Sequence, residues 1–174
     1  MLETGQDWKI AALTTTVCVC FFCEMIFMSE KYINLIVELA LKAQKKDCVP
    51  VGAIVVKNGK VIGKGYNKKE ITNNPLDHAE IIAIKNACKK IKSWRLDNCE
   101  LYVTMKPCDM CKKVIVESRI KKIYYILDNE KENYKNNLLL NQLEFSNVNE
   151  QMYEEKYLKI LKDFFIKKRK KNIQ

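Results

Sequence analysis

The chain has 174 residues, of which 48% are hydrophobic and 30% are charged, and it carries a formal net charge of +10. An apolar fraction of this size excludes an intrinsically disordered chain, and the length is sufficient for one domain with a buried core. The excess of lysine and arginine favours an anionic partner, with nucleic acid as the first candidate, although a lysine-rich soluble surface produces the same balance.

The first segment is apolar enough to be compared with a membrane or targeting sequence. Residues 10–27 are mostly apolar, but the stretch is short for a bilayer span and is interrupted by Glu24. No net basic charge precedes it, as a signal peptide would require. We therefore expect residues 1–27 to be an N-terminal extension outside a domain that spans residues 28–174, with no membrane partner. A membrane anchor or organelle-targeting segment is the alternative.

The remaining residues predict alternating helices and strands. Residues 31–45 repeat apolar side chains every three and four residues, which indicates an amphipathic helix. The turn pair Asn58-Gly59 between two β-type runs predicts a hairpin. Strands are predicted at residues 53–56, 61–66, 100–104 and 122–127, with a weaker one at 143–148. Further helices are predicted from His78 to Ile91, from Pro107 to Ser118 and from Tyr157 onward, with polar loops at 67–76 and 128–141.

This order of elements indicates an α/β fold. Strand–helix–strand connections predict parallel neighbours in the sheet, and the opening hairpin makes the sheet mixed. We expect three α/β/α layers, with a mixed five-stranded sheet and helices on both faces. Asp77 is expected to cap the helix that begins at His78, and Pro107 stands where the start of a helix tolerates proline.

The residues with the most distinctive chemistry lie in two short motifs. The single histidine stands in His78-Ala79-Glu80, and Pro107-Cys108-Asp109-Met110-Cys111 follows. An imidazole and two thiols form a set of zinc ligands, and three protein ligands leave a fourth position for water, as in catalytic sites. Glu80 is expected to transfer protons without binding the metal. Together the two motifs form the signature of zinc-dependent nucleobase deaminases.

Each half of this signature also has a less specific interpretation. A His-x-Glu pair alone usually lies on a helix surface, and a Cys-x-x-Cys pair alone occurs in redox sites. A structural zinc would need a fourth ligand, for which Cys88 and Cys99 are candidates, although Cys88 falls on a buried helical stripe. The cysteines that bind no metal are expected to be free thiols in a reducing cytoplasm.

From about Tyr32 to Lys171 the sequence resembles the bacterial tRNA-specific adenosine deaminases, which belong to the zinc-dependent cytidine/deoxycytidylate deaminase superfamily. The likeness extends beyond the two motifs, to the segments 49–53, 61–67, 101–106, 118–120 and 163–165. It implies a cytidine-deaminase-like fold, a homodimer, and hydrolysis of adenosine to inosine at the wobble position of a tRNA anticodon stem-loop.

The resemblance also implies the roles of individual residues. The implied ligands of one zinc ion per subunit are His78, Cys108 and Cys111, with Glu80 as the catalytic proton shuttle. The implied substrate-binding residues are Asn67, the backbone around Ala79, Val51 in the pocket wall, and Pro107.

The stretch after the fourth predicted strand departs from the family. The family usually has a Gly-Ala pair followed by an acidic residue that contacts the ribose beside the target base, whereas residues 125–131 contain no glycine. By position Asn129 takes the place of the acidic residue, with Asp128 one residue before it. The loop 128–141 is therefore expected to be remodelled where it faces RNA.

Two other functions are compatible with the same motifs. A deaminase of a free base or nucleotide, such as a guanine deaminase, shares the metal site but needs no basic surface. An inactive RNA-binding partner subunit could lose Glu80, which is present here. The basic run at residues 167–171 favours contact with phosphates, and therefore an RNA substrate.

Overall fold

The structure is a computed structural model that describes residues 30–128, 142–148 and 151–171. The chain divides after Tyr32 into two compact units, Met1–Tyr32 and Ile33–Gln174, and the fold is that of the second unit. The predicted extension, residues 1–27, lies outside the described residues, as do Asn129 and the rest of the loop up to residue 141.

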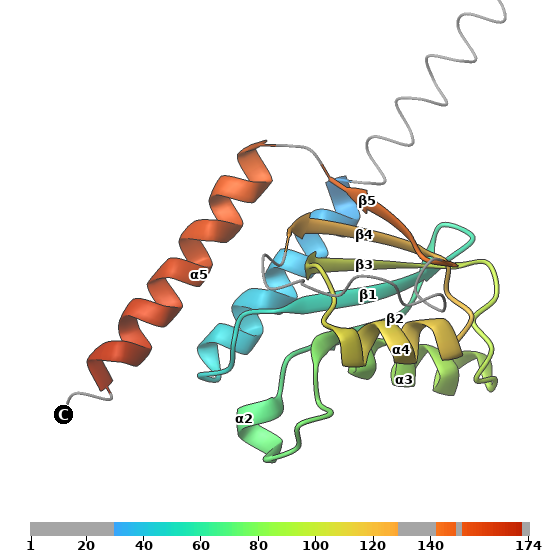
Figure 1. Cartoon of the computed structure of the whole chain (residues 1–174), viewed down its shortest axis with the longest axis horizontal. Helices are drawn as coiled ribbons and strands as arrows, with labels where there is room; N and C mark the ends of the chain where they lie inside the picture. The colour runs from blue at the N-terminus through green and yellow to red at the C-terminus, as the bar shows by residue number, and fades with distance from the viewer. Residues whose placement is uncertain (1–29, 129–141, 149–150, 172–174) are drawn as a thin grey trace, which may run out of the picture. The chain divides into compact units, whose positions relative to one another are not determined.

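The described residues form a mixed five-stranded sheet (Figure 1). In chain order its strands are β1 (Gly52–Lys57), β2 (Lys60–Tyr66), β3 (Cys99–Met105), β4 (Lys122–Leu127) and β5 (Glu144–Asn147). Their order across the sheet is β2-β1-β3-β4-β5. β1 pairs antiparallel with both β2 and β3, whereas β3, β4 and β5 run parallel. The predicted hairpin, the predicted mixed sheet and the weak fifth strand are confirmed.

The central strands are those with continuous apolar runs. In β1 the first five residues are buried, and in β3 the run from Leu101 to Thr104 is buried as well. Side chains of a strand alternate between the two faces of a sheet, so burial of consecutive residues requires cover on both faces. The apolar pattern of these two strands therefore predicts helices on both faces of the sheet.

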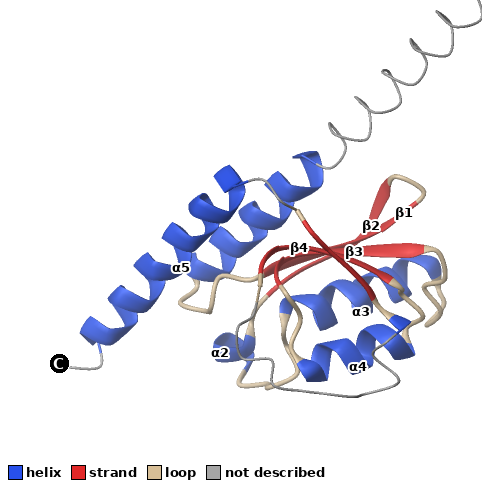
Figure 2. Ribbon diagram, turned by 45° about the horizontal axis from the view of Figure 1, so that its top comes forward, coloured by secondary structure: helices blue, strands red, loops and turns tan. Residues whose placement is uncertain are grey.

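Helices do cover both faces of the sheet (Figure 2). α3 (Ala79–Ile91) and α4 (Asp109–Glu117) lie side by side on one face. Residues 33–45 of the helix over residues 30–45, and α5 (Gln151–Lys171), lie on the other. The short α2 (Lys69–Thr72) was not predicted, because it buries no residue and so leaves no apolar periodicity. None of the helices in the described ranges is long and apolar enough to cross a lipid bilayer.

Two glycines of β2 bring α3 close to the sheet. A Cβ atom on Gly65 would overlap the carbonyl oxygen of Ala79, and one on Gly63 would overlap that of Ala83. Only a residue without a side chain permits this approach of two backbones. The first turn of α3, which carries Glu80, is thereby held against the end of β2.

A chain of hydrogen bonds ties α5 to the segment that leads into β1. The buried Tyr157 hydroxyl donates to the carbonyl oxygen of Pro50 at 2.8 Å and accepts from Thr104 Oγ1 at 3.1 Å. Thr104 Oγ1 in turn accepts from the backbone N–H of Gly52 at 3.2 Å. The position of Val51, between Pro50 and Gly52, is therefore set by a residue more than a hundred positions away in sequence.

Replacing Tyr157 by phenylalanine tests how much this chain of hydrogen bonds stabilises the fold. The change keeps the buried ring but leaves the Pro50 carbonyl and the Thr104 hydroxyl without their partner. An unsatisfied buried polar group costs about 1–3 kcal/mol. We expect Tyr157→Phe to lower the free energy of unfolding, measured in urea, by about that amount.

Tyr124→Phe is the matched control. Tyr124 lies on β4 with its ring stacked on that of Tyr102, the centroids being 4.6 Å apart, and the change keeps this stacking. Its hydroxyl makes no hydrogen bond within the described part of the chain, so we expect little loss of stability. Equal losses in the two variants would contradict the role assigned to the hydroxyl of Tyr157.

Candidate active site

Two helices begin at the residues predicted to bind metal. His78 directly precedes α3 and Cys108 directly precedes α4, and both have an extended backbone, with φ −71° and ψ 153° at His78 and φ −70° and ψ 167° at Cys108. Neither side chain caps its own helix. The prediction that Asp77 caps α3 is wrong. The Asp77 carboxylate instead accepts a hydrogen bond from Asn74 Nδ2 at 3.2 Å, and His78 occupies the capping position.

The three predicted metal ligands lie together. Nδ1 of His78 is 3.7 Å from Sγ of Cys108 and 3.5 Å from Sγ of Cys111. Cys111 reaches the same point because it lies three residues after Cys108, on the same face of the helix. The three donor atoms lie within 4.8 Å of one another, and the described residues contain no other such group. Three donors leave one position of a tetrahedron for water or substrate.

The pKa values of these three side chains favour binding of a metal ion. Hydrogen bonds from Cys111 and His78 lower the pKa of Cys108 to about 4. The neighbouring Cys108 sulfur and burial raise the pKa of Cys111 above its ordinary range, and the hydrogen bond to Cys108 raises the pKa of His78. The N-termini of α3 and α4 add positive potential that favours bound anions. Cys108 is therefore a thiolate at neutral pH, and metal binding would release the protons of its neighbours.

Glu80 lies beside these ligands and is almost completely buried. Its side chain is in the first turn of α3 and is 4% exposed. Burial raises the pKa of its carboxyl group, because the charged form loses hydration. A carboxyl group with a raised pKa can both take up and release a proton near neutral pH, as general acid–base catalysis requires.

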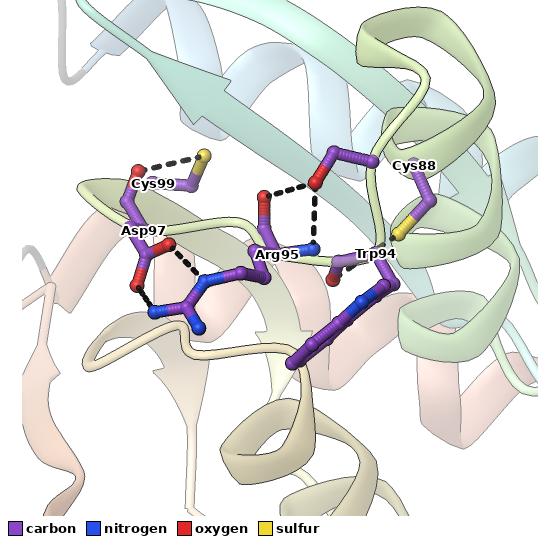
Figure 3. A network of polar contacts seen from close by, with 6 residues as sticks. Cys88, Trp94, Arg95, Asp97 and Cys99 are labelled. Carbon is purple, nitrogen blue, oxygen red and sulfur yellow. Dashed lines mark hydrogen bonds and ion pairs between the residues drawn. The ribbon is translucent and has the colours of Figure 1, made fainter.

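The structure excludes Cys88 and Cys99 as a fourth ligand. Sγ of Cys88 donates to the carbonyl oxygen of Trp94 and Sγ of Cys99 to that of Asp97, each at 3.8 Å (Figure 3). Cys88 is in the last turns of α3, whereas His78 precedes its first turn. The rise of a helix places ten residues about 15 Å apart. The group therefore offers three donor atoms, the number that a catalytic zinc site takes from the protein, and not the four of a structural one.

A pocket of about 260 Å³ opens at the ligands. Besides His78, Glu80 and Cys108, it is lined by three of the four predicted substrate-binding residues, Val51, Asn67 and Ala79. The fourth, Pro107, is buried and does not line the pocket. Three of the predicted substrate-binding residues thus lie at the pocket, whereas Pro107 is buried directly before Cys108.

Backbone groups hold the side chain of Asn67 at the pocket. Asn67 Nδ2 donates to the carbonyl oxygen of Val49 at 3.2 Å, and Oδ1 accepts from the backbone N–H of Lys69 at 3.1 Å. The backbone N–H of Asn67 donates to the Val51 carbonyl at 3.0 Å. A carboxamide has two N–H groups and two acceptor lone pairs on its oxygen. One N–H and one lone pair therefore remain for a substrate.

Five further residues that the sequence did not identify line this pocket: Val49, Lys69, Glu70, Met105 and Lys106. Lys69 and Glu70 belong to α2, whose single turn carries no apolar signal. Lys106 directly precedes the Pro-Cys motif, and this adjacency could have identified it. Its Nζ lies 3.2 Å from Oδ1 of Asp128, so the stretch that departs from the family contacts the pocket.

A second hollow, of about 310 Å³, is larger than the pocket at the ligands. It is lined by residues around the start of β3 and after α4, among them Asp97, Arg119 and Lys122. It contains none of the metal ligands and not Glu80. The chemistry is therefore assigned to the smaller pocket.

Known proteins of similar sequence are deaminases. The MafB19-like deaminase family matches residues 27–169. A tRNA-specific adenosine deaminase of Aquifex aeolicus is 44% identical over 96 residues, which are 55% of this chain and 64% of that protein. The chain spans between 56% and 64% of the length of four bacterial relatives of this kind.

Solved structures similar to this one are also deaminases. A tRNA:A34 deaminase, studied for A-to-I editing at the wobble position of transfer RNA, superimposes with a TM-score of 0.67 at 28% identity, covering 76% of this chain and 99% of that one. Guanine deaminase from Bacillus subtilis superimposes with a TM-score of 0.55 at 36% identity, covering 57% of this chain and 64% of that one. The predicted fold and the predicted resemblance are confirmed, and with a family match over residues 27–169 the chain belongs to the MafB19-like deaminase family.

Proposed function

We propose that the protein hydrolyses adenosine to inosine at the wobble position of a tRNA anticodon, with one zinc ion per subunit. The observation that carries the proposal is the group of His78, Cys108 and Cys111 at one pocket with the buried Glu80. Relatives named for deamination of tRNA adenosine support the choice of substrate.

The donor set fits zinc. Thiolate and imidazole are ligands that zinc prefers, and three protein ligands with one open position match its catalytic sites. The lowered pKa of Cys108 supplies the first thiolate. A zinc ion bound there would lower the pKa of water in the open position to about 7.

Glu80 is the residue that would move the protons. Its carboxylate takes a proton from the attacking water and delivers it to the ring nitrogen beside the carbon under attack. A second transfer, to the amino group, lets ammonia leave. Burial raises the pKa of Glu80, which allows the carboxyl group to hold the proton between the two transfers.

The pocket would hold one nucleobase. At about 260 Å³ it has room for a base but not for a stacked helix, so the target nucleotide has to leave its stack. Bases of an anticodon loop can be splayed out in this way. Asn67 and the backbone of Ala79 would contact the base and Val51 would pack against it. Pro107 would act by holding Cys108.

A free-base deaminase is the second candidate, because guanine deaminase from Bacillus subtilis is 36% identical in sequence. The two candidates differ in what surrounds the pocket. A free purine carries no phosphate, whereas RNA needs positive charge near the site. The net charge of +10 and the basic last turn of α5 favour the RNA substrate.

We expect Glu80→Gln to abolish turnover while leaving zinc and RNA binding intact. Loss of general acid–base catalysis costs about 10²–10⁴ in rate. The measurement is the inosine formed in an anticodon stem-loop with a wobble adenosine, or the ammonia released from it, with guanine and cytidine assayed as alternative substrates. Turnover of guanine alone would favour the second candidate, and wild-type rates in Glu80→Gln would contradict the proton shuttle.

Zinc content tests the ligand set. Cys108→Ser should lower bound zinc from one per chain to nearly none after dialysis, since a serine hydroxyl does not provide the thiolate that zinc binds. His78→Ala should do the same, because the chain has no other histidine. Cys88→Ser is the matched control and should retain zinc, its sulfur lying at the Trp94 carbonyl. Zinc retained by Cys108→Ser would overturn the assignment.

We further propose that the protein acts as a homodimer in the cytoplasm, as the resemblance implies. Trp94 is 58% exposed, and an aromatic side chain of this kind is common at protein interfaces. Light scattering of the purified protein should give twice the mass of one chain. A monomer that is fully active on the stem-loop would count against the dimer.

A further inference from the structure

Three lysines converge on the ring of Tyr66, the last residue of β2. Nζ of Lys42, Lys46 and Lys68 lie 5.3, 5.6 and 5.0 Å from the ring centroid. We propose that these four residues, the Tyr66 cluster, bind a backbone phosphate of the RNA next to the nucleotide that enters the pocket. The inference rests on the proposed function and adds a binding site to it.

The Tyr66 cluster concentrates positive charge that no described carboxylate neutralises. Within the described residues, no ion pair joins Lys42, Lys46 or Lys68 to an acidic side chain. Lys42 lies in the last turn of the helix over residues 30–45, and Lys46 directly follows its end, so the two like charges are close enough to repel. The fold brings a third lysine, Lys68, to the same ring from a different segment. A bound anion would relieve this repulsion and gain charge-assisted hydrogen bonds.

The phenol of Tyr66 supplies a neutral donor among the lysines. Its ring is 9% exposed and packs against Ala43 and Cys48, so the aromatic body is fixed in the core. A hydrogen bond with Lys46 and the charges of the neighbouring lysines lower the pKa of the hydroxyl. A hydroxyl held in a positive field is a suitable donor to a phosphate oxygen.

The Tyr66 cluster lies next to the pocket. Asn67, which lines the pocket, directly follows Tyr66, and consecutive Cα atoms are about 3.8 Å apart. The backbone N–H of Lys68 donates to the carbonyl oxygen of Asp77, the residue before His78, at 3.0 Å. A nucleotide whose base enters the pocket leaves its phosphates at the rim, and the Tyr66 cluster is within reach of one of them.

The neighbouring carboxylate, that of Asp47, pairs with lysines of α5 and not with those of the Tyr66 cluster. Asp47 follows Lys46 in sequence, but its Oδ2 is 3.0 Å from Nζ of Lys168 and 3.4 Å from Nζ of Lys171. These ion pairs dock the last turns of α5 next to the Tyr66 cluster. The basic end of α5 therefore lies next to the Tyr66 cluster, and Asp47 pairs with lysines of α5 and not with those of the cluster.

The test compares two triple variants of the zinc-loaded, full-length protein. Lys42→Gln/Lys46→Gln/Lys68→Gln removes the charges of the Tyr66 cluster. Lys60→Gln/Lys85→Gln/Lys89→Gln removes the same number of charges from exposed positions at the start of β2 and on α3. Affinity for a fluorescein-labelled anticodon stem-loop is measured by anisotropy at several salt concentrations, together with kcat and KM for inosine formation.

We expect the first variant to raise Kd and KM at least about ten-fold, and to reduce the slope of log K against log salt by about 0.7 for each phosphate that the variant no longer neutralises. Its kcat should change little, and the control should stay near wild type. Tyr66→Phe, which keeps the ring and the lysines, should raise Kd by a smaller factor. Equal effects of the two triple variants on Kd and on the slope would overturn the inference.

A neutral phosphate locates the binding position. Stem-loops that carry one methylphosphonate, placed in turn on each side of the wobble nucleotide, should include one that weakens wild-type binding but not that of the Tyr66 cluster variant. If every methylphosphonate weakened binding by the Tyr66 cluster variant as much as binding by the wild type, the inference would be overturned.

Inosine formation by the wild-type protein tests the proposed function separately. Inosine formed without dependence on the Tyr66 cluster would overturn the inference alone. Binding that depends on the Tyr66 cluster without inosine would overturn the proposed function alone, and absence of stem-loop binding would overturn both.

Discussion

The site depends on two helix N-termini that meet at one edge of the sheet. β2 and β3 are each antiparallel to β1, so they run in the same direction, and β4 is parallel to β3. α3 connects β2 to β3 and α4 connects β3 to β4, so both helices begin at the carboxyl ends of parallel strands. In open α/β sheets, ligands bind outside the carboxyl ends of the strands. A shift of α3 relative to α4 would separate His78 from the two cysteines.

The positions of the candidate metal ligands are maintained by contacts at a distance from them. Glycines at positions 63 and 65 allow α3 to press on β2, which sets the depth of His78 and Glu80. On the opposite face of the sheet, Tyr157 of α5 fixes the segment before β1 through Pro50 and Thr104. α5 contributes no residue to the pocket, yet it determines where Val51 in the pocket wall lies.

The sequence predicted those features that depend on residues close together in the chain. The strands, the two helices that begin beside the motifs, and the meeting of His78 with Cys108 and Cys111 follow from apolar runs and from two short motifs. The cap of α3 was predicted wrongly because the Asp77 carboxylate accepts a hydrogen bond from Asn74 instead of capping the helix. The capping propensity of aspartate does not reveal this contact. α2 was missed since a turn without buried residues has no period to detect. Tyr157 was predicted only as part of an apolar stripe, because its partners are separated from it by most of the chain.

The region after β4 is where the sequence departs from the tRNA-specific adenosine deaminases that it resembles. The family usually has glycines and an acidic residue there, and this chain has no glycine in residues 125–131. Asp128 nevertheless lies 3.2 Å from Lys106 Nζ and accepts a hydrogen bond from the Tyr125 hydroxyl at 3.4 Å. Asp128 therefore places a carboxylate beside Lys106, which lines the pocket. The pair of Asp128 and Lys106 therefore sets the charge at this side of the pocket.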